Sequence, residues 1–158
     1  MRFLKRKLMR LYVRIVREKK PPEFIARGWA LGMFVGCAVP FGFQLVISVP
    51  LSVPLKGSKI GAVMGTLITN PLTIFFIYPF QTWLADQLFL QGNLSYAELA
   101  NVEWTFETTV NLGTEVFTAF LMGGGLLALV LTPLTYFSVR ALVRRHRLRV
   151  AARQKAGR

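Results

Sequence analysis

Three long runs of apolar residues, none of which contains a charged side chain, dominate the hydropathy pattern of the chain. They cover residues 28–55, 60–85 and 116–139 and are 28, 26 and 24 residues long. About 20 apolar residues suffice to cross the hydrocarbon core of a bilayer, so each run is long enough to enter a membrane. The pattern therefore predicts an all-α membrane protein.

Glycines spaced four residues apart accompany the first two runs. One ladder consists of Gly28, Gly32 and Gly36, and the other consists of Gly57, Gly61 and Gly65. Residues four apart share one face of a helix, and glycine lets a second backbone approach that face closely. We interpret both ladders as helix-packing faces, formed either within the chain or between subunits.

A proline break interrupts each of these two runs. Pro40-Phe41-Gly42 precedes Gln44 in the first run, and Asn70-Pro71 precedes Thr73 in the second. Asparagine is a favoured N-cap and proline a favoured first helical residue, so the second break predicts a half-helix that starts at depth in the membrane. We expect the first break to do the same. The unpaired N–H groups of a helix start carry partial positive charge, which suits an anionic or oxygen-rich ligand.

A purely structural interpretation of the breaks stays open beside this one. Broken backbone inside a membrane needs hydrogen-bond partners whatever the protein does. The polar side chains available for that purpose are Gln44, Thr66, Asn70 and Thr73. In this interpretation they join helical segments and bind no ligand.

Basic and acidic residues are concentrated in different parts of the chain. The net charge is +13, and of the 20 Lys and Arg residues ten lie in residues 1–27 and eight lie from Arg140 onward. Residues 86–115 hold five of the seven acidic residues and no basic one. This asymmetry predicts both termini in the cytoplasm and residues 86–115 outside. Because anionic lipid head groups attract such basic ends, we expect no nucleic-acid partner.

The same charges predict how the first run enters the membrane. Arg27 precedes it and Lys56 and Lys59 follow it, so both of its ends are predicted to be cytoplasmic. Two full crossings need about 40 residues, which is more than the run contains. We therefore predict a re-entrant helical hairpin over residues 24–55, with half-helices near 28–39 and 43–53.

The remaining segments complete a polytopic membrane protein with a single domain. We predict a Pro-broken transmembrane helix over residues 57–89, with Tyr78 near its outer end, and a closing transmembrane helix over 115–142. Residues 90–114 are predicted to form an external loop with a short helix, and residues 143–158 a basic cytoplasmic tail. Residues 1–20 have the spacing of a basic amphipathic helix, which lies on the membrane surface or binds a partner.

The sequence carries no catalytic signature. We therefore expect no enzymatic activity, and we expect neither a metal nor a cofactor. The single cysteine, Cys37, is expected to pack as a small hydrophobic residue. The lack of Asp, Glu, Lys and Arg residues inside the apolar runs argues against proton- or sodium-coupled transport, which usually needs such buried groups.

Residues 22–85 resemble a bacterial membrane-protein family catalogued as domain of unknown function 2062. The resemblance rests on Ala26-x-Gly28-x-Ala30-x-Gly32, on Gly36, Pro40 and Gln44, and on Asn70-Pro71-x-Thr73. Members usually carry an asparagine two positions after the basic residue of the middle loop, whereas here Ser58 follows Lys56. The resemblance implies a small protein of the bacterial inner membrane, sometimes joined in relatives to glycosyltransferase modules. It implies no established activity.

Three functional hypotheses follow. The leading one is transport or flipping of an anionic amphipathic substrate, such as a phospholipid or a polyprenyl phosphate, by a homo-oligomer. Pro40, Gly42, Gln44, Asn70, Pro71 and Thr73 would then form the site, and Arg27, Lys56 and Lys59 would gather the phosphate. The alternatives are a non-catalytic scaffold for a membrane glycosyltransferase or another envelope enzyme, and a small channel.

Overall fold

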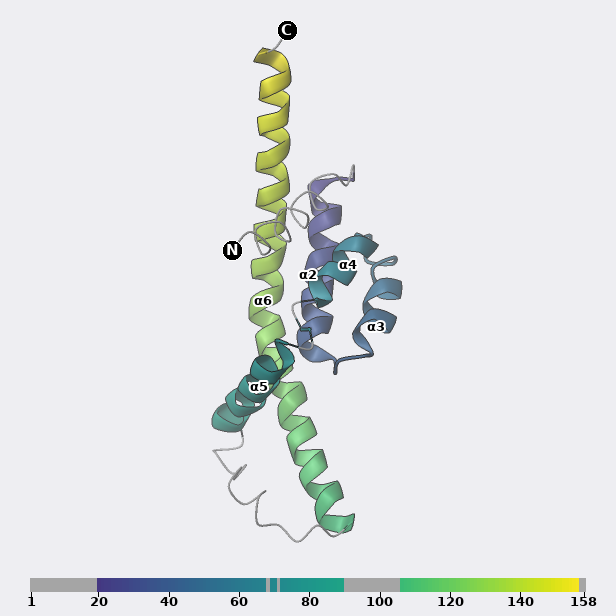
Figure 1. Cartoon of the computed structure of the whole chain (residues 1–158), viewed down its shortest axis with the longest axis vertical. Helices are drawn as coiled ribbons and strands as arrows, with labels where there is room; N and C mark the ends of the chain where they lie inside the picture. Colours follow the sequence, from purple (N-terminus) through teal and green to yellow (C-terminus); the bar gives the residue numbers. More distant parts are fainter. Residues whose placement is uncertain (1–19, 68, 71, 90–105, 157–158) are drawn as a thin grey trace.

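The computed structural model describes residues 20–67, 69–70, 72–89 and 106–156, which form five helices and no strand. The helices are α2 (Pro22–Ala38), α3 (Gln44–Leu51), α4 (Lys59–Thr66), α5 (Ile74–Phe89) and α6 (Phe106–Ala156). The all-α prediction is therefore confirmed. Helix α6 is the long axis of the molecule, α2 lies along it, and α3 and α4 lie beyond α2 (Figure 1).

Helices α2 and α3 form a hairpin that closes at the first proline break. Helix α2 starts with Pro22 at its first position and ends at Ala38. Gly42 then takes a φ of 103°, a left-handed conformation that glycine adopts without strain. Helix α3 ends at Leu51, directly after Pro50, so it stops short of the predicted end near residue 53.

Helix α4 starts beside the start of α2 and runs parallel to it. The Ser58 side chain caps α4 by accepting a hydrogen bond from the Gly61 N–H at 2.9 Å. The Ser58 N–H in turn donates to the carbonyl oxygen of Phe24 at 3.0 Å. The chain therefore comes back, after α3, to the start of α2.

The two glycine ladders meet each other at the interface of α2 and α4. A Cβ atom on Gly28 would lie 2.2 Å from the Ser58 carbonyl oxygen, and one on Gly32 would lie 2.2 Å from that of Ala62. A Cβ atom on Gly65 would lie 2.5 Å from the Trp29 carbonyl oxygen. These contacts are too close for any side chain, so glycine is what allows the two backbones to touch.

Helix α6 uses a second group of glycines to pack against α5 and α2. A Cβ atom on Gly123 would lie 1.7 Å from the Gln81 carbonyl oxygen in α5, and one on Gly124 would lie 2.4 Å from the Cys37 carbonyl oxygen in α2. Nothing lies within 4 Å of a Cβ atom on Gly125. The three helices therefore converge where α5 crosses α6 (Figure 1).

Helix α6 is longer than the predicted closing helix. It begins at Phe106, inside the predicted external loop, and continues through Pro133 and the predicted tail to Ala156. Among the described residues, Gly113–Ala152 is the one helical stretch long and apolar enough to cross a membrane. The predicted surface helix and the short external helix fall on residues 1–19 and 90–105, outside the described residues.

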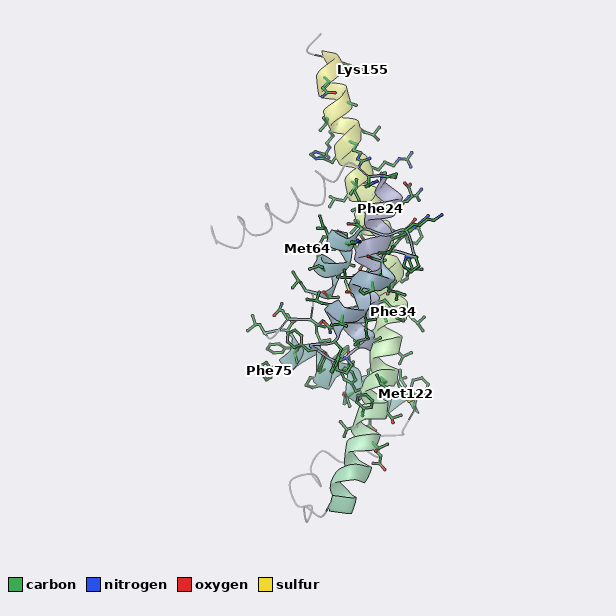
Figure 2. All side chains as sticks on the ribbon, turned by 90° about the vertical axis from the view of Figure 1, so that its right-hand side faces the viewer. Phe24, Phe34, Met64, Phe75, Met122 and Lys155 are labelled. Carbon is green, nitrogen blue, oxygen red and sulfur yellow. The ribbon has the colours of Figure 1, made fainter. Side chains whose placement is uncertain are left out.

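Large apolar side chains on α5 and just before it are exposed. Leu72, Phe75 and Phe76 each expose 76% of their surface. Phe75 lies at the edge of the molecule and points away from α6 (Figure 2). Exposed apolar surface of this kind marks a membrane or protein contact, which agrees with a chain that associates with membranes.

Candidate functional site

Gln44, the first residue of α3, makes hydrogen bonds across the first break. Its side chain is buried, and its Nε2 atom donates to the carbonyl oxygens of Gly36 and Val39, both at 3.0 Å. Its Oε1 atom accepts a hydrogen bond from the Thr69 hydroxyl at 3.1 Å. Gln44 therefore satisfies two carbonyls left free at the end of α2, and it also links the first break to the second.

Asn70 and Thr73 cap each other at the second break. The Asn70 Oδ1 atom accepts from the N–H groups of Leu72 and Thr73 at 2.9 and 3.2 Å. The Thr73 hydroxyl oxygen accepts from the Asn70 N–H at 2.9 Å. This reciprocal pair closes the start of α5 in the manner of a capping box. The adjoining Pro71 lies outside the described residues.

The start of α3 differs from the start of α5 because no side chain caps it. Its N-cap position is held by Phe43, whose side chain accepts no hydrogen bond. A pocket of about 180 Å³ lies against this helix start and is lined by residues from both breaks. They are Phe41, Gly42, Gln44, Leu45, Thr66, Leu67, Thr69 and Asn70. The structure thus brings the predicted residues Gly42, Gln44 and Asn70 together around one cavity, next to Pro40.

The predicted basic residues form a second group. A Cβ atom on Gly57 would lie 3.3 Å from the Arg27 carbonyl carbon, so the backbones of Arg27 and Lys56 are neighbours. Lys59 starts α4 three residues after Lys56, and the side chains of Arg27, Lys56 and Lys59 are all exposed. Ala38, the last residue of α2 before the break, lies eleven residues along the helix from Arg27. This separation corresponds to about 16 Å at 1.5 Å per residue. The basic group and the pocket are therefore separate sites.

The family of the chain follows from a comparison with known families. Residues 5–151 match the family described as "Uncharacterized protein conserved in bacteria (DUF2062)". The chain belongs to this family. The DUF2062 match extends from before α2 to the last turns of α6, well beyond the residues 22–85 that carry the resemblance. No curated protein and no solved structure matches the chain significantly.

Two residues of the DUF2062 pocket region were not predicted as site residues. Thr69 binds Gln44 as described above, and its place directly before Asn70 is the signal that could have found it. The Tyr78 hydroxyl lies 3.5 Å from the Gln44 Nε2 atom, and the Tyr78 ring packs edge-on against Phe120 at 4.7 Å. Tyr78 therefore lies close to Gln44 and the first break. Its predicted place near the external face of the membrane stays a prediction.

The described part of the DUF2062 chain has little other polar chemistry. No group of three His, Cys, Asp or Glu side chains in it lies close enough to hold a metal ion. Cys37 is fully buried, as expected of a cysteine that packs as a small hydrophobic residue. The polar side chains that line the pocket at the breaks are the amides of Gln44 and Asn70 and the hydroxyls of Thr66 and Thr69. Each of them makes a hydrogen bond within the chain.

Proposed function

We propose that this DUF2062 protein translocates an anionic amphipathic lipid, of the phospholipid or polyprenyl-phosphate class, across the bacterial inner membrane. The observation that carries the proposal is the uncapped start of α3, which opens onto a pocket shared by both breaks. A helix start with free N–H groups attracts negative charge. The pocket is small, so it receives the phosphate while the acyl chains stay in the lipid.

The proposed membrane arrangement places this pocket at depth. The hairpin of α2 and α3 enters and leaves from the cytoplasmic side, α4 and α5 form a broken crossing, and α6 closes the bundle with both termini in the cytoplasm. The distance of about 16 Å from Arg27 to the end of α2 is close to half of a hydrocarbon core that is about 30 Å thick. Broken half-helices at such depth are common in the substrate sites of transporters.

The basic group supplies the first step of the proposed path. Arg27, Lys56 and Lys59 are exposed at the end of the molecule where α2 and α4 start. Basic residues at a cytoplasmic surface attract anionic head groups. Lipid gathered there moves along the bundle toward the break. Because one chain provides few crossings, the proposed protein is a homo-oligomer that encloses the path between its subunits.

Two substitutions of Asn70 separate a role in translocation from a role in folding. Asn70→Ser and Asn70→Asp both keep a side-chain oxygen that caps α5, so both variants retain the fold. Asn70→Asp also adds a negative charge beside the pocket, which repels a phosphate. The measurement is the translocation of a fluorescent phosphatidylglycerol in proteoliposomes. Asn70→Ser is expected to translocate it, whereas Asn70→Asp loses at least tenfold, a factor equivalent to about 1.4 kcal/mol of repulsion.

The controls for this assay are the thermal midpoints of both variants and their reconstitution yields. If Asn70→Asp folds and translocates at the wild-type rate, the pocket at the breaks is not the path of the phosphate. If the wild-type protein gives the rate of empty liposomes, the proposal of translocation itself is overturned.

A scaffold for an envelope-polysaccharide or lipid-modifying enzyme is the second candidate. The observation that favours it is the internal use of the polar groups at the breaks. Gln44 and Asn70 both make hydrogen bonds within the chain, as a purely structural role requires. A detergent pull-down from native membranes that recovers an enzyme in constant ratio supports this candidate.

A further inference from the structure

A second and larger hollow runs along the outside of the bundle, between α2, the end of α3 and α6. Its volume is about 620 Å³, which lies within the range of about 300–1,000 Å³ for ligand pockets. From α2 it is lined by Arg27, Ala30, Leu31 and Phe34, and from the α3 side by Leu51 and Leu55. The α6 wall consists of Thr132, Pro133, Tyr136 and Phe137. We refer to this hollow as the α2–α6 groove.

The α2–α6 groove has a charged end and an apolar body. The residues that line it from α2 span Arg27 to Phe34, which corresponds to about 10 Å along the helix axis at 1.5 Å per residue. Arg27 is the one charged residue among its described lining residues. Leu55, which also lines the groove, is followed directly by the exposed Lys56. Positive charge is therefore concentrated at one end, and the walls beyond it are apolar.

This combination fits one kind of ligand. We propose that the α2–α6 groove binds one anionic phospholipid, with its phosphate at Arg27 and Lys56 and an acyl chain along α2 and α6. The inference deepens the proposed function and rests on it for the class of lipid. It adds a binding site that lies apart from the pocket at the breaks and that holds the lipid at the cytoplasmic end.

The charge at the end of the groove favours a lipid over a second copy of the chain. An apolar groove in contact with lipid gains little by exchanging one apolar neighbour for another, because there is no hydrophobic driving force between apolar groups in a bilayer. Selectivity must then come from the charged end. An anionic phosphate pairs with Arg27, whereas a second copy brings a chain with a net charge of +13.

Site-specific photo-crosslinking tests this binding site at equilibrium, without any need for translocation. p-Benzoylphenylalanine replaces Phe34, which lines the groove, or Phe75, which is exposed on α5, in the full chain. The protein is reconstituted in vesicles of equal parts phosphatidylglycerol and phosphatidylethanolamine. The measured quantity is the ratio of the two lipids in the crosslinked product. Arg27→Gln is combined with each probe, and Arg145→Gln, on an exposed site of α6, is the matched charge control.

The proposal predicts about fivefold enrichment of phosphatidylglycerol at position 34 over position 75, the factor that one basic residue near anionic lipid supplies. Arg27→Gln removes most of this enrichment and Arg145→Gln leaves it in place. Equal ratios at both positions, enrichment that survives Arg27→Gln, or a crosslink to a second protein chain would each overturn the proposal. Enrichment that persists while Asn70→Asp translocates normally supports the groove and contradicts only the site at the breaks.

Discussion

At the scale of single residues, the packing depends on glycines, which have no Cβ atom, and on the side-chain amide of Gln44, whose nitrogen and oxygen both make hydrogen bonds within the chain. Glycine lets α6 touch both α2 and α5, and Gln44 holds the end of α2 with one side chain. The importance of Gln44 could be predicted because it is a polar residue two positions after Gly42 of the first break. Its contact with Tyr78 could not, because Tyr78 approaches it only after α5 has folded back beside the first break.

Adjacent glycines in α6 provide a matched test of the close contacts. Gly124→Ala places a Cβ atom 2.4 Å from the Cys37 carbonyl oxygen, so α2 and α6 must separate. The expected cost is about 1–3 kcal/mol, as for other overpacked sites. Gly125→Ala meets no neighbour and is expected to stabilise the helix by up to about 1 kcal/mol. Thermal unfolding in detergent measures both, and a lower midpoint for Gly125→Ala than for Gly124→Ala contradicts the packing described.

Gln44→Leu tests the hydrogen bonds at the first break. It leaves the buried carbonyl of Gly36 and the partly buried carbonyl of Val39 without their side-chain donor, which is expected to cost about 1–3 kcal/mol of stability. Gln87→Leu makes the same chemical change at an exposed site of α5 and is expected to be close to neutral. Urea or thermal unfolding in detergent compares the two. Equal midpoints would show that the bonds of Gln44 contribute nothing to stability.

At the scale of helices, the breaks are what the sequence predicts well. Pro40 and Gly42 follow the end of α2, and Pro50 lies next to the end of α3, where proline disrupts the helix. Asn70 caps the start of α5 with its side-chain oxygen. The start of α6 is predicted less well, since apolar periodicity begins near residue 116 while the helix begins at Phe106. The polar first turns of a helix do not show in a hydropathy pattern.

An ion pair between α2 and α6 makes the contact between these two helices sensitive to pH. Arg140 donates to the Glu23 carboxylate at 3.0 Å. A hydrogen bond from the Glu23 backbone N–H, and then the bond from Arg140, hold the pKa of Glu23 below its ordinary value. This contribution to stability is complete above the ordinary pKa of a glutamate, about 4.3, and is lost as the pH falls through the lower folded value.

Between pH 5 and pH 3, the stability of Glu23→Gln is therefore expected to fall less than that of the wild type. This pH range is centred near the ordinary pKa of a glutamate. The effect is small, because both side chains are about 40% exposed and surface pairs contribute little. Thermal midpoints of wild type, Glu23→Gln and Arg140→Gln across this range provide the measurement. Identical slopes in all three proteins would show that the pair does not link α2 to α6 in solution.

At the scale of the whole molecule, the decisive feature is that both glycine ladders pair within one chain. Their spacing alone left contacts between subunits equally open, and only the return of the chain to the start of α2 brings Gly65 against Gly32. That pairing aligns α2 and α4 in parallel, so both breaks fall at the same level and share one pocket. Long-range pairing of this kind has no local sequence signal.

Both breaks are proposed to lie at mid-membrane below a basic cytoplasmic end, and spin-label depths measured in lipid vesicles can decide this. In a Cys37→Ser background, single labels at the exposed positions Phe41, Leu72 and Lys56 are compared in lipid vesicles. We expect deep labels, inaccessible to an aqueous quencher, at Phe41 and Leu72, and a shallow label at Lys56. A label at Phe41 or Leu72 as accessible to water as the label at Lys56 would contradict it.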